Sequence, residues 1–251
     1  MDVALFVPCY IDQMYPGDGQ ATAAVLRRAG CTVHFDARQT CCGQPMANSG
    51  CGRDAAVLAR RHLDIFAGMT TVCPSGSCTS MVKNHYAHLP MTIDAADKQT
   101  QADTHELSHF LVNILGVTDL GATFPHTVAV HQSCHGLREL NLGRMSERMD
   151  PERASPAETL LNQVQGITLH KPARRDECCG FGGTFAVTEP ALSVRMGEDR
   201  LDDLGSQGAE YMVAGDMSCL MHLDGIRSRR KRGPKAIHLA EILASTVASK
   251  A

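Results

Sequence analysis

The cysteines of this chain follow a four-part pattern that occurs twice. Each copy has one cysteine after an apolar run, then two adjacent cysteines followed by glycine, and then a fourth cysteine after another apolar run. The two sets are Cys9, Cys41, Cys42 and Cys78, and Cys134, Cys178, Cys179 and Cys219. A repeat with a period of about 125 residues indicates duplication of one structural unit. We therefore predict two tandem, pseudo-symmetric units, residues 1–122 and residues 123–251.

The spacing and the flanking text support the repeat. The first interval has 31 intervening residues in the first set and 43 in the second, and the last interval has 35 and 39. The differences are the size of loop insertions. VALFVPC (3–9) resembles VAVHQSC (128–134), and TTVCPSGSC (70–78) resembles YMVAGDMSC (211–219). Each half then closes with a short helical pattern, at 105–115 and at 237–246.

Apolar runs alternate with helical periodicity in both halves, which predicts an α/β fold with parallel sheets flanked by helices. Strands are expected at 2–8, 31–35, 70–73, 127–132, 167–170 and 210–214. Helices are expected at 18–29, 53–66, 156–165 and 184–206, and from Thr79 and Leu220 onward.

This topology predicts where the cysteines lie. In each half the first cysteine, the adjacent pair and the fourth cysteine each follow the end of a different strand. The carboxyl ends of parallel strands lie along one edge of a sheet, where ligands usually bind. We therefore expect each set of four thiols to converge into its own site.

Four thiolates from one chain can hold zinc or an iron–sulfur cluster. Adjacent side chains diverge, so a polynuclear cluster accommodates a cysteine pair with less backbone strain than one tetrahedral ion. The pattern therefore favours an iron–sulfur cluster, with zinc in one site as an alternative. Gly43 and Gly180 follow the pairs, where the backbone approaches a ligand or takes a positive φ. A disulfide framework fits less well, because the number of cysteines, eleven, is odd.

Composition narrows the class of protein. The formal net charge of −3 argues against nucleic acid as the main partner. No apolar run approaches the roughly 18 residues of a membrane span, and the N-terminus has no secretory pattern. A cysteine-rich chain without such a signal is expected in a reducing, cytoplasmic compartment.

Several reactive residues lie outside the repeat. Cys31 and Cys73 fall in predicted strands and are expected to be small buried hydrophobes, whereas Cys51 could approach the first site. His131 and His135 flank Cys134 and could shuttle protons or orient a thiolate, or have no special role. The basic run RSRRKRGPK (227–235) is expected to be a solvated loop, with an anionic substrate or an acidic partner as the alternative.

The motif text resembles a known family. The segments LFVPCYIDQMYP (5–16), TCCGQPMANSG (40–50), HQSCHGLREL (131–140) and CCGFGGTFAV (178–187) are similar to the cysteine-rich CCG-domain family. Within that family the chain is most similar to the lactate utilisation protein A group of iron–sulfur oxidoreductase subunits, which is related to the glycolate oxidase iron–sulfur subunit and to heterodisulfide reductase. The resemblance covers nearly the whole chain.

The resemblance implies an iron–sulfur electron-transfer subunit that acts with two other subunits, one with ferredoxin-type clusters, to oxidise L-lactate to pyruvate. The eight cysteines of the repeat would bind the cofactor, a [4Fe-4S] cluster. The residues alone do not distinguish lactate from glycolate or another 2-hydroxy acid. They also do not identify the electron acceptor.

The sequence departs from the family at one point in each site. The fuller family pattern ends in Cys-x-x-Cys, but Ser75 and Asp216 stand three residues before Cys78 and Cys219. Serine and aspartate can ligate through oxygen, but oxygen is a harder ligand than sulfur. This departure puts in doubt the unusual non-cubane cluster associated with heterodisulfide reductase relatives. It leaves an ordinary [4Fe-4S] or [2Fe-2S] cluster, or zinc in one site, as the alternatives.

No catalytic acid–base motif, phosphate-binding loop, dinucleotide fingerprint or flavin motif is recognisable in the sequence. The chain is therefore expected to need partners for substrate oxidation rather than to be a complete dehydrogenase. Two other functional classes stay open at this point. One is a zinc-binding scaffold subunit without a redox role, and the other is a thiol–disulfide oxidoreductase that uses the adjacent cysteines.

Overall fold

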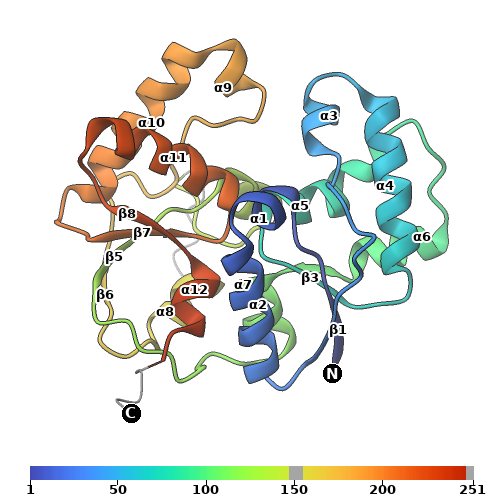
Figure 1. Cartoon of the computed structure of the whole chain (residues 1–251), viewed down its shortest axis with the longest axis horizontal. Coiled ribbons are helices and arrows are strands. Elements are labelled where there is room, and N and C mark those ends of the chain that lie inside the picture. The colour runs from blue at the N-terminus through green and yellow to red at the C-terminus, as the bar shows by residue number, and fades with distance from the viewer. Residues whose placement is uncertain (147–154, 247–251) are drawn as a thin grey trace.

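Two four-stranded parallel sheets, one in each half of the chain, form the framework of the protein (Figure 1). The structure is a computed structural model, and it describes residues 1–146 and 155–246. The first sheet has the order β2-β1-β3-β4, with β1 at Asp2–Leu5, β2 at Thr32–His34, β3 at Thr71–Cys73 and β4 at Thr104–Glu106. The second has the order β6-β5-β7-β8, with β5 at Thr127–Val130, β6 at Thr168–His170, β7 at Tyr211–Ala214 and β8 at Lys235–His238. The same order in both halves confirms the predicted fold class.

Helices cover both sheets. Those of the first half are α1 (Cys9–Met14), α2 (Pro16–Arg28), α3 (Gln44–Asn48), α4 (Gly52–Phe66), α5 (Gly76–Ser80), η1 (Met81–His85), η2 (Tyr86–His88), α6 (Ala95–Ala102), α7 (Leu107–His109) and η3 (Phe110–Ile114). Those of the second half are η4 (His135–Glu139), α8 (Pro156–Leu161), α9 (Phe185–Thr188), α10 (Pro190–Gly205), α11 (Met217–Arg230) and α12 (Leu239–Ala244).

The central strands are short apolar runs in the sequence, because helices cover both of their faces. The strands β1, β3, β5 and β7 are almost fully buried, whereas the edge strands β2 and β6 are largely exposed or half-buried. The strands β1 and β5 each lie between two parallel neighbours in their sheet. This arrangement brings the loops that follow β1, β2 and β3 to one edge of the first sheet, and those after β5, β6 and β7 to one edge of the second.

The two halves share a continuous core. One cluster of buried apolar side chains includes Val3 and Val25 from the first half and Val128 and Leu243 from the second. The helices α2 and α12 pack against each other across this boundary. There the Arg28 guanidinium donates hydrogen bonds to the carbonyl oxygens of Leu120, Leu243 and Ala244, at 3.3, 3.0 and 2.8 Å. The relative position of the two sheets is therefore held by packing as well as by the chain connection.

The structure corrects two expectations. The segments at 105–115 and 237–246 are not helical throughout, because each begins in a fourth strand, β4 or β8. The basic run at 227–235 is not a solvated loop, because its first four residues complete α11 and Lys235 begins β8. Within the run, Arg227 pairs with Asp224 and Arg230 pairs with Asp202, each at 2.7 Å.

Among the described residues, no helix is both long and apolar enough to cross a membrane.

Candidate metal centres

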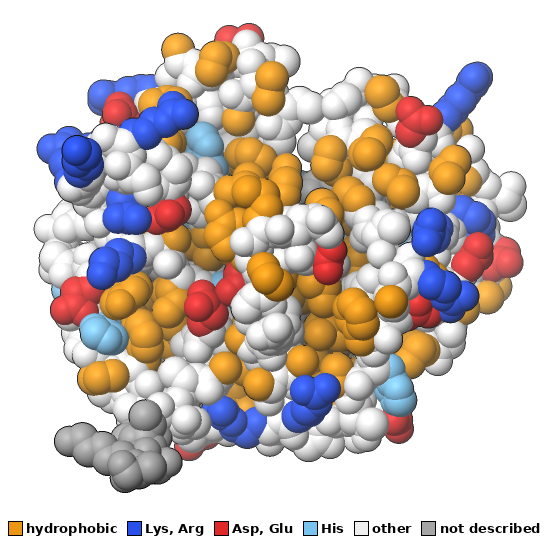
Figure 2. All heavy atoms as spheres, in the orientation of Figure 1, with side chains coloured by type: hydrophobic (Ala, Val, Ile, Leu, Met, Phe, Trp, Pro, Cys, Tyr) orange, Lys and Arg blue, Asp and Glu red, His pale blue; other side chains and the backbone are white. Residues whose placement is uncertain are grey.

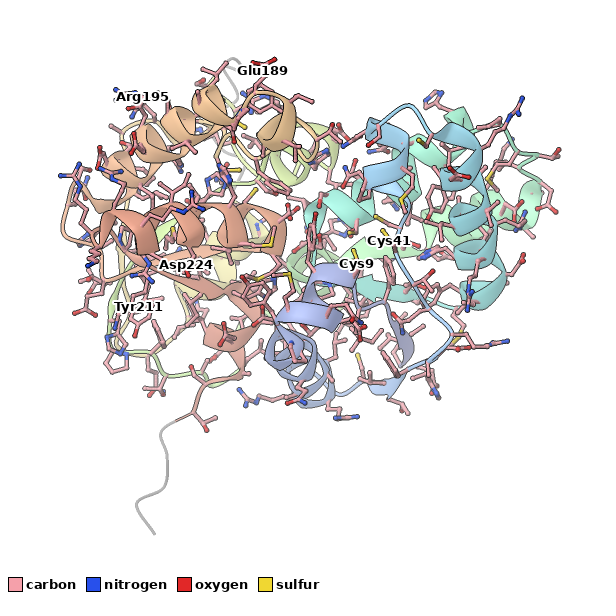
Figure 3. All side chains as sticks on the ribbon, turned by 45° about the horizontal axis from the view of Figure 1, so that its top comes forward. Cys9, Cys41, Glu189, Arg195, Tyr211 and Asp224 are labelled. Carbon is pink, nitrogen blue, oxygen red and sulfur yellow. The ribbon has the colours of Figure 1, made fainter. Side chains whose placement is uncertain are left out.

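The first set of cysteines converges at the carboxyl edge of the first sheet. Cys9 begins α1 directly after β1, Cys41 and Cys42 lie in the loop after β2, and Cys78 lies in α5 after β3. The Sγ atoms of Cys9 and Cys41 are 3.7 Å apart, and those of Cys42 and Cys78 are 3.4 Å apart. Figure 3 shows Cys9 and Cys41 side by side. All four thiols are free.

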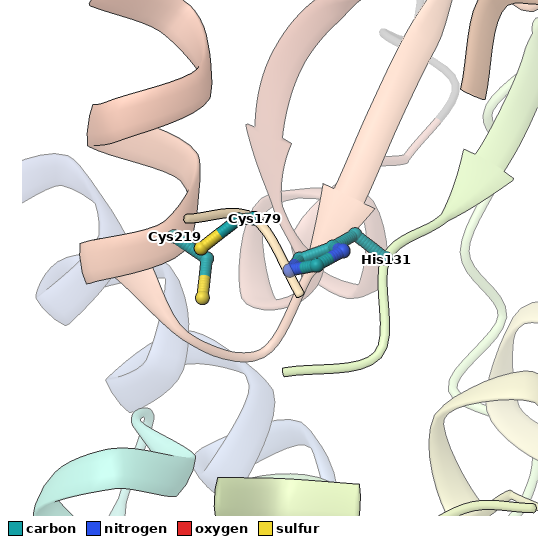
Figure 4. A group of neighbouring side chains, drawn as sticks. All are labelled: His131, Cys179 and Cys219. Atoms are coloured by element: carbon teal, nitrogen blue, oxygen red, sulfur yellow. The ribbon is translucent and has the colours of Figure 1, made fainter. Parts of the chain in front are cut away.

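The second set has the same arrangement. The thiol of Cys178 interacts with that of Cys134, and the thiol of Cys179 with that of Cys219, closely enough to shift their pKa values. These four thiols are also free. A ring nitrogen of His131 and the Sγ atoms of Cys179 and Cys219 all lie within 4.8 Å of one another (Figure 4). Thus both sets converge as the strand topology predicts, and a histidine joins the second.

The glycine after each cysteine pair turns the backbone back onto the thiols. Gly43 and Gly180 have φ angles of 87° and 86°, in the left-handed region that favours glycine. In this conformation the N–H of Gly43 donates to Sγ of Cys41 at 3.4 Å, and the N–H of Gly180 donates to Sγ of Cys178 at 3.3 Å. The CCG motif therefore places a backbone donor on the first thiol of each pair.

Each set holds one strongly acidic thiol. The pKa of Cys41 is lowered to about 3 by its interactions with the neighbouring thiols of Cys42 and Cys9. The pKa of Cys178 is lowered to about 2 in the same way, by Cys134 first and then Cys179. The neighbouring thiols have raised pKa values in turn. A group of thiols that shares negative charge in this way is suited to bind a cation, because metal ligands must be deprotonated.

The two sets line one cavity between the halves of the chain. Its volume is about 490 Å³, and all eight cysteines contribute to its wall. Two contacts across it join the halves: the rings of Tyr10 and Phe181 meet edge to face at 6.3 Å, and Nε2 of Gln44 lies 3.1 Å from Nε2 of His135. Figure 2 shows apolar side chains gathered where the two halves meet. The sequence predicts two sites, but not that both open into the same space.

Comparison with known proteins agrees with this duplicated site. The model of the CCG cysteine-rich domain matches residues 3–83 and again residues 128–224, so each match contains one set of four cysteines. The chain belongs to the CCG cysteine-rich domain family.

Similar proteins match this CCG chain over nearly its whole length. It is 39% identical to a protein of Exiguobacterium sp. (strain ATCC BAA-1283 / AT1b) over 249 residues, 96% of each chain. It is 38% identical to one of Bacillus subtilis (strain 168), covering 98% of this chain and all of the other. It is 40% identical to one of Macrococcus caseolyticus (strain JCSC5402), covering 98% of each. All three are named "Lactate utilization protein A", which confirms the predicted resemblance.

The CCG sites have the properties that a metal or cluster requires. The donors in each set are four soft thiols. The separations of 3.4 and 3.7 Å are well beyond the roughly 2.05 Å of a disulfide bond, so the sulfurs are together without being bonded. The glycine N–H groups lie at the sulfurs, and the shared cavity adjoins both sets. The residues present therefore fit a sulfur-ligated metal or cluster in each site.

Ser75 and Asp216, which replace the expected fifth cysteine, are helix caps. The Ser75 hydroxyl accepts a hydrogen bond from the N–H of Cys78 at 3.4 Å, at the start of α5. Asp216 is fully buried at the start of α11. One of its oxygens accepts from the N–H and the hydroxyl of Ser218, and the other accepts from the N–H of Ser77 in the opposite half at 2.6 Å. Both oxygens of Asp216 are therefore occupied by hydrogen bonds within the protein. These bonds explain why an aspartate stands at this position, and no metal ion is needed to explain it.

The three cysteines outside the repeat do not line the shared cavity. Cys31 is buried but precedes β2 rather than lying in it, and Cys73 is buried at the end of β3. Cys51 is exposed at the start of α4. His135 lies at the cavity, as its position beside Cys134 suggested.

His131 belongs to the second set through Cys179 and Cys219. One ring nitrogen lies near the Sγ atoms of these two cysteines, and Nδ1 accepts a hydrogen bond from Arg200 of α10. Arg200 is fully buried and pairs with Asp203 at 2.8 Å. Sequence reasoning missed Arg200, because an arginine in an amphipathic helix ordinarily lies on the solvated face. The repeat does mark the position of His131, because it aligns this histidine with Phe6 of the first half. It gives no signal for Arg200.

Proposed function

We propose that this chain is an iron–sulfur electron-transfer subunit of a multi-subunit cytoplasmic complex that oxidises L-lactate to pyruvate. The observation behind the proposal is the convergence of two four-thiol sets on one cavity. The names of the relatives supply the substrate. We further propose that each set binds one cluster, of the [4Fe-4S] type, through Cys9, Cys41, Cys42 and Cys78 and through Cys134, Cys178, Cys179 and Cys219.

A bound iron–sulfur cluster would supply one-electron redox chemistry at each set. The protein would supply the thiolates and the backbone donors at Cys41 and Cys178. Hydrogen bonds to cluster sulfurs favour the more negative, reduced state, so the CCG glycines would make reduction easier. Both sets line one cavity, so clusters held by them would lie close enough in the same chain to exchange an electron.

Oxidation of lactate to pyruvate releases two electrons and two protons, and the described residues contain no recognisable site for the substrate's own hydride chemistry. We therefore propose two partner subunits, one of them with ferredoxin-type clusters. An exposed apolar surface beside the cavity supports such contacts. Val187, which lines the cavity, is 80% exposed, and Leu192 on the following helix is 53% exposed. Side chains of this kind are common at binding surfaces.

The proposal is tested by replacing the first cysteine pair, Cys41→Ser with Cys42→Ser. Anaerobically purified protein should contain iron and sulfide with a visible charge-transfer spectrum, and the double variant should lose the share bound by the first set. The α/β core should stay folded, because these ligands lie in a loop beyond the strands. The variant should also abolish growth on lactate where this is the only route for lactate. Cys51→Ser is the matched control, because this exposed cysteine lies outside both sets.

Two outcomes would redirect the assignment. Zinc in both sites, no iron, and a double variant that still supports growth would indicate a scaffold subunit. Disulfide reduction by metal-free protein would indicate a thiol–disulfide oxidoreductase. That second candidate is favoured by one specific observation, the strongly lowered pKa of Cys41 and Cys178 beside thiols with raised pKa values.

A further inference from the structure

His131 directs an unpaired polar atom at the second set of cysteines. Its side chain lies at the end of β5 and is only 2% exposed. Its Nε2 atom is buried and has no hydrogen-bond partner. Figure 4 shows the far end of the ring turned toward Cys179 and Cys219. A buried polar atom without a partner is costly, so its orientation needs an explanation.

The neighbour of His131 fixes where its proton lies. Nε of Arg200 is 3.1 Å from Nδ1 of His131. A guanidinium has only donors, so Nδ1 must be the acceptor. In a neutral imidazole the other nitrogen then holds the proton, which places an N–H on Nε2. The arginine cannot turn away readily, because it also bonds the Asp203 carboxylate at 2.8 Å and the Val130 carbonyl at 3.4 Å inside the core.

This tautomer excludes His131 as a neutral metal ligand. A ligating histidine uses the lone pair of one nitrogen and usually donates the N–H of the other to a carboxylate or carbonyl. Here the order is reversed: the nitrogen away from the site accepts, so the nitrogen that faces the thiols is a donor. In this group, Cys179 and Cys219 are therefore suited to be metal ligands. His131 is suited to donate a hydrogen bond to sulfur rather than to be a third ligand.

At the equivalent position the first half has Phe6, whose side chain contains no hydrogen-bond donor. The N–H of Phe6 bonds the Val72 carbonyl at 2.9 Å, and the N–H of His131 bonds the Val213 carbonyl at 2.8 Å, so the two residues occupy equivalent backbone positions. The Phe6 ring packs against His62 of α4, at 4.6 Å between ring centroids, where His131 instead meets Arg200 of α10. The two sites thus share their thiols and glycines but differ at this position.

We propose that Nε2–H of His131, positioned by Arg200, donates a hydrogen bond to a sulfur of the second site and makes the cluster there easier to reduce than the cluster of the first site. This rests on the proposed function in that both groups are iron–sulfur clusters. A hydrogen bond from N–H to sulfur stabilises the extra negative charge of a reduced cluster. One electron would move from the first cluster to the second, and no proton would move, because His131 keeps its proton throughout. His131 would therefore determine the direction of electron flow between the two clusters.

The test is a redox titration of anaerobically prepared protein, followed by electron paramagnetic resonance. The double variant Cys178→Ser with Cys179→Ser identifies the signal of the second site. His131→Phe copies the residue of the first site, and the ratio of reduced to oxidised second cluster at a fixed potential should fall at least tenfold, equivalent to about 59 mV for one electron. His131→Gln should restore much of the ratio, because its amide can accept from Arg200 and donate to sulfur. Phe6→Leu is the matched control and should leave the second cluster unchanged.

An unchanged midpoint potential in His131→Phe, with both clusters present, would overturn the inference and leave the proposed function standing. Strong nitrogen hyperfine coupling to the second cluster would also overturn it, because the histidine would then be a ligand. If His131→Phe does not fold, the Gln variant and the ¹⁵N chemical shifts of His131 decide the matter. Protein that takes up zinc and no iron contradicts the proposed function. The ¹⁵N shifts then support the hydrogen bond if Nε2 is protonated and overturn it if Nδ1 is.

Discussion

The substitution Gly180→Ala tests how the CCG loop holds the second site. Gly180 has a φ of 86°, and a Cβ added there would lie 2.6 Å from the carbonyl oxygen of Ser193 and 2.7 Å from Cβ of Met196. The Ser193 hydroxyl also donates to the Gly180 carbonyl at 2.7 Å. Because that bond ties the start of α10 to the loop, the backbone of α10 cannot retreat from a new methyl group without losing it.

Two other glycines separate the cost of the left-handed backbone conformation from the cost of the steric clash. Gly30 has a φ of 84° and no atom within 4 Å of the position that a Cβ would take. Gly30→Ala should therefore lower the free energy of unfolding only by the strain of a left-handed alanine, about 1 kcal/mol. Gly43 has a φ of 87° and a nearest contact of 3.2 Å to the Ala55 carbonyl, so its cost should be about 1–2 kcal/mol. Gly180→Ala adds overpacking of about 1–3 kcal/mol to the conformational cost, for about 2–5 kcal/mol in total.

The assay is urea unfolding of the three variants at matched metal content, together with the metal content of each protein as purified. The free energy of unfolding should fall in the order Gly30→Ala, Gly43→Ala, Gly180→Ala. Only the last should strongly reduce metal at the second site, because the Gly180 N–H would no longer face Cys178. Equal losses in Gly43→Ala and Gly180→Ala would refute the steric reasoning, since the two positions have nearly the same φ and differ in the space around them.

Two further substitutions test the contacts between the halves. Burial and the neighbouring carboxylate of Glu241 raise the pKa of Asp18 from 3.8 to about 7, so the folded state holds a proton that the unfolded state releases. Stability should therefore fall as pH rises from about 4 to 7, by up to about 4 kcal/mol, and Asp18→Asn should flatten this dependence in unfolding measured at both pH values. Asp216→Ala removes a helix cap and leaves the Ser77 N–H unpaired, so unfolding free energy should drop by about 2–4 kcal/mol. Asp224→Ala, at a surface pair with Arg227, should cost less than about 1 kcal/mol, and equal losses at the two aspartates would count against the buried role.

The sequence predicts the first three strands along the chain in each half, because their apolar runs are bounded by turns. It does not predict the fourth strands, β4 and β8, because each is short and runs directly into a helix. Glu106 and His238, the last residues of these strands, are also the caps of the helices that follow. The local pattern is dominated by the helix, and only pairing with β3 or β7 defines the strand. The boundary between residues 122 and 123 stays a prediction.

The convergence of each cysteine set follows from strand order, so the sequence could predict it. The shared cavity could not be predicted in the same way. It depends on how α2 and α12 pack, and on contacts such as that of Gln44 with His135, between residues that are 91 positions apart. The same limit applies to His131 and Arg200, because a pair separated by 69 positions has no spacing that reveals it.

If both sites hold clusters as proposed, the repeat would give two sites with the same thiols different redox properties. The thiols and the CCG glycines must keep their geometry, because a change there removes a ligand or a donor. The residue after the central strand is under a weaker constraint, since Phe6 and His131 make the same backbone bond whatever their side chains are. A substitution at this one position, with a buried arginine to orient it, would change how readily a bound cluster is reduced without moving any thiol. Side chains that contact the sulfurs from behind are therefore the places to look for differences between the two sites, and these do not appear in the CCG motif itself.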